Sequence, residues 1–215
     1  MRKKDELAID RILGCAEQEF LEKGFEGASM RTIAESAGYT TGMLYGRFAD
    51  KGELFRAIVK EAADRLYTYY ACAQDEFARI SPEAQYTEMH GYVDARVDEM
   101  LDIVYDSFDA FKLIICKSKG SEYENYVDRL IAIETDNTVR FVDALNAAGI
   151  RVNEVRADLS HMLATAMFNG MFEVVEHDFT KEDARQYVRQ LRAFFKAGWD
   201  RILGLPSDRA PHATE

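Results

Sequence analysis

With 215 residues, 47% of them hydrophobic, the chain can fill a sizeable core, which excludes a disordered protein. Its formal net charge of −11 lies wholly outside residues 1–60, where ten Lys and Arg balance ten Asp and Glu, so only this segment can approach phosphates easily. No window approaches the roughly 18 apolar residues of a membrane span, and we expect a cytoplasmic protein with no membrane partner.

Four helices are predicted in the first eighty residues. Apolar residues recur there at three- and four-residue spacing, which is typical of helices with one buried face. Ser29 predicts one N-cap and either Thr40 or Thr41 another, while Gly24 and Gly38 predict left-handed helix ends. The predicted helices cover residues 5–23, 29–37, 40–48 and 51–79. The second and third are too short to be stable alone, so we expect them to pack on the first and fourth.

Five further helices are predicted in the remaining chain. Residues 81–83 (Ser-Pro-Glu) begin one of them, and Ser121 with Glu124 forms a capping box for another. Asn153 and Thr180 are the predicted caps of the last two. The predicted helices cover residues 82–106, 108–117, 121–149, 153–177 and 180–204. Because no Val, Ile and Thr-rich stretch is bounded by turn residues, strands are not expected, and we predict an all-α fold of about nine helices.

The two short helices joined by Gly38 and Tyr39 form a helix-turn-helix. In this arrangement the second helix presents an exposed face to the major groove while the first crosses the backbone. Leu44 and Phe48 point inward, four residues apart. The residues on or beside the outer face are Thr40, Thr41, Met43, Tyr45 and Arg47. The alternative is a structural corner in an unrelated helical protein, with Tyr45 half-buried.

About 45 residues of this segment resemble the signature of the TetR (tetracycline repressor) family. The matching residues are Ile12, Leu13, Ala16, Phe20, Gly24, Phe25, Ser29, Ile33, Ala34, Ala37, Gly38, Gly42, Leu44, Tyr45, Phe48, Lys51 and Leu54. The resemblance implies that Tyr45 and the first residues of the third helix, with Gly42, contact DNA. It also implies that Lys51, with free amides beside it, binds a phosphate and that Arg31 lies near the other strand.

The segment departs from the family pattern at three positions. Thr41 stands where the family often has lysine, and Gly46 and Arg47 stand where it often has an aromatic residue and histidine. Arg47 can supply the missing charge, whereas the bases that are read stay open. The expected division is a helix-turn-helix DNA-binding domain over 1–52, an effector-binding and dimerisation domain over 53–204 and a flexible tail over 205–215.

A single helix-turn-helix domain makes few DNA contacts, so specific binding requires a homodimer that reads a palindromic operator. In the family the last two helices pair with their symmetry mates. The candidate interface residues are Leu163, Ala166, Gly170, Val174, Leu191, Phe195, Gly198, Trp199 and Ile202. The same residues can instead belong to the core of a single chain, because helical periodicity does not distinguish a dimer interface from an intramolecular core.

Polar residues on the apolar faces of the middle helices predict a pocket for a small-molecule effector. Asn137 lies between Ile133 and Phe141 at four-residue spacing, so it points inward and needs a partner, which is either a ligand or a neighbouring side chain. The pocket candidates are Tyr70, Met100, Phe108, Phe111, Asn137, His161, Thr165 and Asn169. The aromatic and methionine members are also typical of ordinary core.

The resemblance implies a repressor that its effector releases from DNA. The alternatives are an effector-independent DNA-binding protein or a partner-binding helical protein. A di-metal enzyme would use Glu-x-x-His pairs on two helices, whereas only Asp158 and His161 approximate that spacing, so we expect no enzyme, no metal and no cofactor. Cys15, Cys72 and Cys116 lack metal-ligand spacing, which favours buried thiols in a reducing compartment and leaves a redox switch open.

Overall fold

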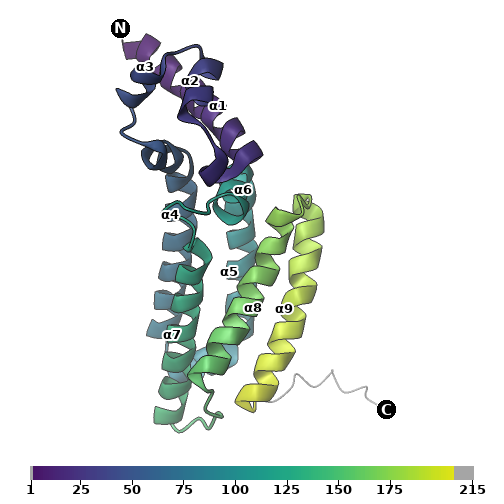
Figure 1. Cartoon of the computed structure of the whole chain (residues 1–215). Coiled ribbons are helices and arrows are strands. Elements are labelled where there is room, and N and C mark those ends of the chain that lie inside the picture. Colours follow the sequence, from purple (N-terminus) through teal and green to yellow (C-terminus); the bar gives the residue numbers. More distant parts are fainter. Residues whose placement is uncertain (1, 206–215) are drawn as a thin grey trace. The chain divides into compact units, whose positions relative to one another are not determined.

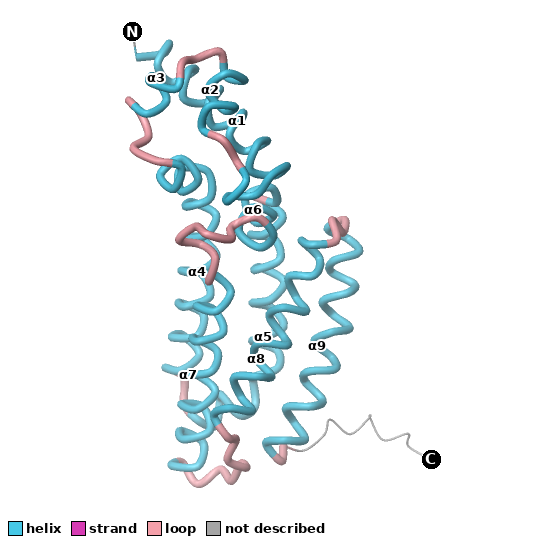
Figure 2. The backbone as a smooth tube through the Cα atoms, in the orientation of Figure 1, coloured by secondary structure: helices cyan, strands magenta, loops and turns pink. Residues whose placement is uncertain are grey.

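The computed structural model describes the backbone of residues 2–205 and the side chains of residues 7–205. These residues form nine helices and no strand, which confirms the all-α prediction (Figures 1 and 2). The helices are α1 (Arg2–Gly27), α2 (Met30–Ala37), α3 (Thr41–Tyr45), α4 (Lys51–Arg79), α5 (Pro82–Asp106), α6 (Phe108–Cys116), α7 (Tyr126–Ala147), α8 (Ala157–Glu176) and α9 (Lys181–Leu203).

The chain divides into two compact units that differ from the three expected parts. Unit 1 comprises Met1–Tyr67 and Ile103–Tyr126, and unit 2 comprises Thr68–Asp102 and Val127–Glu215. Unit 1 therefore contains α6 and the first half of α4 in addition to the three N-terminal helices. The functional boundary after residue 52 stays a prediction, and residues 206–215 of the expected tail lie outside the described residues.

An aromatic cluster forms the core of unit 1 between α1, the start of α4 and the segment after α6. Phe55 contacts Phe20 and Phe25 edge-to-face, with ring centroids 5.0 and 5.3 Å apart, and Tyr123 lies 6.1 Å from Phe55. Gly24 adopts φ 70° and ψ 170°, so the predicted stop is a kink inside α1 that turns Phe25 toward the cluster. The Phe25 N–H then donates to the Lys117 carbonyl at 2.8 Å, which ties α1 to α6.

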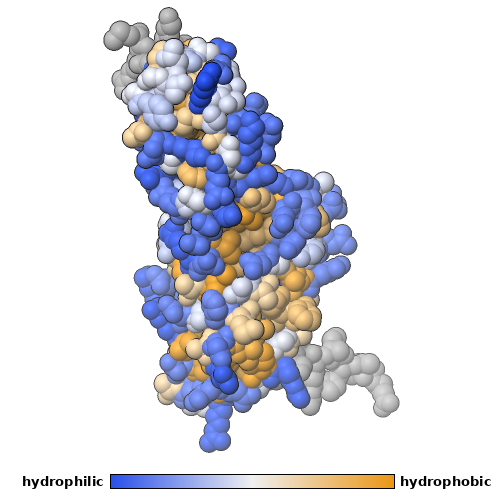
Figure 3. All heavy atoms as spheres, viewed as in Figure 1, coloured by the Kyte–Doolittle hydropathy of each residue, from blue (hydrophilic) through white to orange (hydrophobic). Residues whose placement is uncertain are grey.

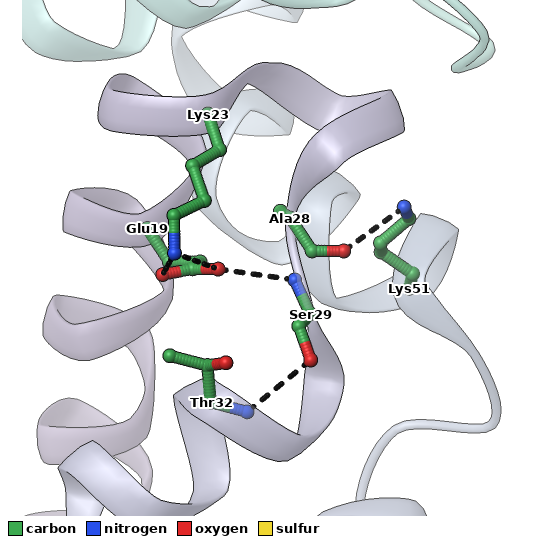
Figure 4. A network of polar contacts seen from close by, with 6 residues as sticks. All are labelled: Glu19, Lys23, Ala28, Ser29, Thr32 and Lys51. Atoms are coloured by element: carbon green, nitrogen blue, oxygen red, sulfur yellow. Dashed lines mark hydrogen bonds and ion pairs between the residues drawn. The ribbon is translucent and has the colours of Figure 1, made fainter.

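A polar network fixes the start of α2 against α1 (Figure 4). The buried Glu19 carboxylate accepts hydrogen bonds from Lys23 Nζ at 3.2 Å and from the Ser29 N–H at 3.1 Å. Ser29 Oγ in turn accepts from the Thr32 N–H, as the predicted N-cap requires. The network thus satisfies two backbone donors at the junction of α1 and α2 that would otherwise lose hydrogen bonds on folding.

In unit 2, α8 and α9 lie side by side, as Figure 1 shows. A Cβ added at Gly170 of α8 would lie 3.1 Å from Leu191 of α9, so the absence of a side chain permits their close approach. Thr180 caps α9 and Gly204 ends it in the left-handed conformation at φ 71°, both as predicted. The Thr180 and Gly204 signals therefore identify both ends of α9.

Two predicted helix starts are wrong because other partners use the capping side chains. Helix α8 begins after Arg156 and not at Asn153, whose amide donates to the Ile202 carbonyl at 2.9 Å and so joins the preceding loop to the end of α9. Helix α7 begins at Tyr126, since Ser121 Oγ accepts from the Tyr123 N–H in a local turn. The expectation of three buried thiols is also wrong: Cys72 is exposed, while Cys15 and Cys116 are half-buried.

No helix in the described part of the chain combines the length and the apolar character that a bilayer crossing needs.

Candidate nucleic-acid interface and ligand cavity

Helices α2 and α3 form a helix-turn-helix within unit 1. Gly38 ends α2 at φ 79°, a conformation that favours glycine, and its N–H donates to the Glu35 carbonyl. Thr40 Oγ1 accepts from the Met43 N–H at 3.3 Å, which settles Thr40 as the cap of α3. Helix α3 ends at Tyr45, three residues earlier than predicted. The turn is therefore only three residues long and sets α3 against α2.

The faces of α3 separate as the spacing predicts. Leu44 and Phe48 are buried, at 0% and 8% exposure, and hold the segment on unit 1. Met43 and Tyr45 are each 50% exposed, so both large side chains are accessible to a binding partner. Thr40 and Gly42 are exposed, and Thr41 and Arg47 are half-buried. Four of the candidate DNA-contacting residues of this segment, Thr40, Gly42, Met43 and Tyr45, are therefore accessible.

Arg31 on α2 is accessible and is held in position by a neighbour on the same helix. Its Nε donates to Glu35 Oε1 at 2.8 Å, with both side chains mostly exposed, and this contact raises the pKa of Arg31. An exposed pair of this kind contributes little to stability, so the guanidinium can exchange Glu35 for a phosphate at small cost. Its placement in unit 1 is compatible with the predicted phosphate contact.

Lys51 has structural partners that the sequence did not reveal. Its ammonium donates to the Ala28 carbonyl at 3.2 Å (Figure 4). It also donates to the Glu26 carbonyl at 3.1 Å and lies 4.8 Å from the centre of the Phe25 ring. These contacts join the start of α4 to the loop between α1 and α2. A phosphate contact by Lys51 stays a prediction and would add to these bonds.

One amide in the first turn of α4 is not free, contrary to expectation. The Glu53 N–H donates to Asp50 Oδ1 at 2.7 Å, and the Glu53 carboxylate accepts from the Ala49 N–H at 2.6 Å. These reciprocal bonds are close to a capping box. The Glu53 amide is therefore occupied, which corrects the expectation at that position.

Unit 2 encloses a cavity of about 430 Å³ between α4, α5, α7, α8 and α9. Seven Phe, Tyr or Trp and four Met side chains belong to its lining, and the Phe77 ring contacts those of Tyr92 and Phe141, with ring centroids 5.1 and 6.0 Å away. Tyr70 meets Phe168 edge-to-face at 5.5 Å. This volume lies within the range of small-ligand pockets, roughly 300–1,000 Å³.

A carboxylate with two neutral hydrogen-bond donors lies in the cavity wall. Gln74 Nε2 donates to Glu134 Oε2 at 2.8 Å and to Tyr70 Oη at 2.9 Å, and the Tyr70 hydroxyl donates to the same Glu134 oxygen. Burial raises the pKa of Glu134, opposed in part by these hydrogen bonds, and burial together with Glu134 raises the pKa of Tyr70. Burial therefore favours the protonated form of the Glu134 carboxyl, whereas the hydrogen bonds from Tyr70 and Gln74 favour its charged form.

Three predicted pocket residues line this cavity and five do not. Tyr70, Met100 and Asn137 belong to the lining. Phe108 and Phe111 lie in unit 1, where Phe111 is buried core. On α8, His161 and Asn169 are exposed and Thr165 Oγ1 donates to the His161 carbonyl of its own helix, so the cavity is lined by Met167, Phe168 and Met171 instead.

Glu134 and Gln74 were not predicted, although a signal for one of them exists. Glu134 lies three residues before Asn137 and so shares its helix face, next to the buried Leu130 and Ile131. The four-residue spacing of Ile133, Asn137 and Phe141, on which the prediction rests, does not include Glu134. Gln74 carries no comparable signal, since it lies among Asp75 and Glu76 on a long helix.

The predicted dimer residues have different environments within unit 2. Val174 is 1% exposed and has no surface for a partner, and Phe195 and Trp199 line the cavity. Ala166 and Gly198 are exposed, while Leu163, Gly170, Leu191 and Ile202 are half-buried. The most exposed apolar side chains of these helices are Phe194 at 73% and Met162 at 67%. Figure 3 shows apolar side chains on the face where α8 and α9 lie.

Comparison with known proteins relates the N-terminal segment to regulators. The family described as "Bacterial regulatory proteins, tetR family" matches residues 12–58. The chain is 40% identical over 63 residues to the HTH-type transcriptional repressor AcnR of Corynebacterium diphtheriae, covering 28% of this chain and 33% of AcnR. It is 28% identical over 105 residues to the HTH-type transcriptional regulator UidR of Escherichia coli K12, covering 49% and 47%. The matches span a third to a half of these relatives, which are named as regulators and not as enzymes.

Solved structures share the fold over most of the chain. SCO3833 of Streptomyces coelicolor, a member of the TetR transcriptional regulator family, aligns with a TM-score of 0.58 and 19% identity over 87% of this chain and 90% of its own. NalD of Pseudomonas aeruginosa, the secondary repressor of the MexAB-OprM multidrug efflux pump, aligns with a TM-score of 0.54 and 17% identity over 88% and 96%. At these identities the likeness concerns the fold alone.

Proposed function

We propose that this chain, a member of the TetR family through residues 12–58 and its fold, is a DNA-binding transcriptional regulator of the cytoplasm. The exposed pair Met43 and Tyr45 on α3 is the observation that carries the proposal, because the same short helix buries Leu44 completely. A helix held down by one face and open on the other fits the major groove. Arg31 supplies a phosphate contact from α2.

The regulator acts as a homodimer that binds a palindromic operator, and it represses transcription. The repressor AcnR is the relative that supports this direction of control. Phe194 and Met162 support the dimer, since apolar side chains so exposed on adjacent helices are suited to an interface with a second copy. A two-fold dimer presents two α3 helices to half-sites about one DNA turn, roughly 34 Å, apart.

A small-molecule effector bound in the cavity of unit 2 releases the protein from DNA. The cavity supports this step because it has the size and apolar lining of a ligand site. An effector that lowers operator affinity about 100-fold must favour the non-binding state by roughly 2.7 kcal/mol. The alternative is effector-independent DNA binding, in which ligands of the cavity leave operator affinity unchanged.

Selection from a pool of random DNA duplexes, followed by fluorescence anisotropy of the enriched sequence across a salt series, tests the proposal. We expect a palindrome, sub-micromolar affinity and a steep salt slope. Arg31→Ala weakens binding and lowers the salt slope by about one. The matched control is Arg156→Ala, which also removes an exposed arginine paired with a carboxylate (side-chain exposure 80% for Arg31 and 82% for Arg156). Failure to enrich any sequence, or equal effects of both substitutions, contradicts DNA reading by this face.

A further inference from the structure

One buried side-chain atom in the described lining of the unit 2 cavity lacks a hydrogen-bond partner, and it is an acceptor. Asn137 donates its amide to the Ile133 carbonyl at 2.8 Å, whereas its Oδ1 is buried and has no hydrogen-bond partner. A buried acceptor without a hydrogen-bond partner destabilises the unliganded protein, so a ligand that supplies a donor there gains affinity. Asn137 lines the cavity, one turn along α7 from Glu134.

Glu134 supplies a second acceptor on the same helix face. Tyr70 and Gln74 both donate to its Oε2, and no described residue donates to Oε1 or forms an ion pair with this carboxylate. Gln74 has used its two amide hydrogens, one on Glu134 and one on Tyr70. Protein groups therefore saturate one oxygen of Glu134 and leave the other available to a ligand.

The basic residues of the lining make an anion the competing ligand class. These residues are Arg96, Arg140, Arg192 and Lys196. Arg96 Nη2 lies 3.1 Å from Glu76 Oε2 and its Nη1 lies 3.6 Å from Glu99 Oε2, while Arg192 pairs with Asp94. Arg140 is exposed. The charges of Arg96 and Arg192 are thus already matched, whereas the carboxylate of Glu134 is not.

We propose that the effector is an organic amine with a flat apolar body, whose ammonium donates to Glu134 Oε1 and to Asn137 Oδ1. The aromatic lining around Phe77 and Tyr70 accommodates the apolar body, and the faces of these rings also favour a cation. Charge-assisted hydrogen bonds in an apolar cavity are about twice as strong as neutral ones, so the charge itself is selected. This inference rests on the proposed effector site and names its ligand class.

Three naphthalene probes of nearly equal size test the charge preference. They are 2-naphthylmethylamine, a cation near neutral pH, 2-naphthylmethanol, which is neutral, and 2-naphthoate, an anion. Calorimetric titration into the purified full chain measures each affinity. We expect the amine to bind about tenfold or more tightly than the alcohol, and the anion to bind most weakly. Equal affinities, a preference for naphthoate, or no binding of the amine overturns the proposal.

Substitutions identify the atoms that produce the preference. Glu134→Gln retains the size of the side chain and removes its charge, so the preference of the amine over the alcohol should fall to about twofold or less, with the alcohol itself little changed. Asn137→Leu should weaken the amine about threefold to tenfold. The control Glu88→Gln removes an exposed carboxylate of α5 outside the lining and should change nothing. An unchanged amine preference in Glu134→Gln, with circular dichroism showing intact helices, overturns the assignment.

The DNA experiment separates this inference from the proposed function. A chain that binds its operator but prefers the alcohol or the anion keeps its proposed function and loses the amine assignment. A chain that prefers the amine but enriches no DNA sequence keeps the ligand class of the cavity and loses the regulatory role. The two readouts use different molecules and different parts of the chain, so neither failure imitates the other.

Discussion

The Glu19 carboxylate accepts a hydrogen bond from the Ser29 N–H, ten residues further along the chain, at 3.1 Å. Glu19 is only 7% exposed, and Lys23 is the cation that balances it. A buried carboxylate is costly unless it is paired and hydrogen-bonded, so the position of α2 on α1 depends on both partners. The junction that supports the helix-turn-helix is thus polar, within an otherwise apolar packing.

We expect Glu19→Ala to lower the free energy of unfolding by about 1–3 kcal/mol, because the Ser29 N–H loses its acceptor in a poorly hydrated site. Urea denaturation followed by circular dichroism measures the change. Glu35→Ala is the control, since its partner Arg31 is exposed and the loss of such a pair costs below about 1 kcal/mol. If the two variants unfold at the same urea concentration, the Glu19 network does not stabilise the junction.

Lys51→Met should reduce both thermal stability and operator affinity. Methionine keeps most of the apolar stem but removes the ammonium that donates to the Glu26 and Ala28 carbonyls, so we expect a loss of about 1 kcal/mol. Lys60→Met, which removes an exposed lysine paired with Asp64, is the control and should leave stability nearly unchanged. A variant with normal melting and weakened DNA binding would indicate that Lys51 acts on phosphate alone.

Glu134→Gln should stabilise the protein at neutral pH and lose that advantage in acid. Burial raises the pKa of Glu134 in the folded state, so stability from this carboxyl is complete below its unfolded pKa and is lost as pH rises through the folded pKa. Glutamine carries no charge and escapes this loss. Melting temperatures of both proteins between about pH 4.5 and 8 test this: the curves should converge at the acid end, and a constant offset would contradict the raised pKa.

Phe194→Glu should convert the proposed dimer to a monomer and weaken operator binding at least about tenfold, because the two copies would bring buried carboxylates into one apolar interface. Light scattering after size-exclusion chromatography measures the mass. Val139→Glu introduces the same charge at another exposed apolar position, on α7, and should leave both mass and affinity unchanged. A dimer that persists in Phe194→Glu would place the interface elsewhere.

Local signals predicted the helix-turn-helix well. Ser29, Thr40 and Gly38 act on amides or carbonyls within four residues, so sequence spacing alone defines their bonds. Asn153 does not act as a cap: its Nδ2 donates to the carbonyl of Ile202, 49 residues away, and this bond holds the side chain at the end of α9. A short pattern contains no information about such a distant acceptor.

The cavity could be predicted only in part for the same reason. Asn137 was recognised because it interrupts an apolar stripe, whereas the role of Glu134 depends on Gln74 and Tyr70, which approach from another helix. Glu134 Oε1 is left available because Tyr70 and Gln74 both donate to Oε2, and this arrangement exists only in the folded structure. The polar line of His161 and Asn169 was assigned inward, yet α8 turns Met167 and Met171 toward the cavity and leaves that line exposed.

The two carbonyls and the aromatic ring around Lys51 constrain which residue type can occupy position 51 in homologous sequences. A compact ammonium can donate to both carbonyls, at 3.1 and 3.2 Å, whereas the planar guanidinium of arginine presents its donors in a fixed fork. Folding alone therefore favours lysine at this position, even in homologues that bind a different DNA sequence. A lysine conserved at position 51 would then reflect its structural contacts. Differences between homologues in the DNA sequence that they bind should be sought at Met43, Tyr45 and Arg47.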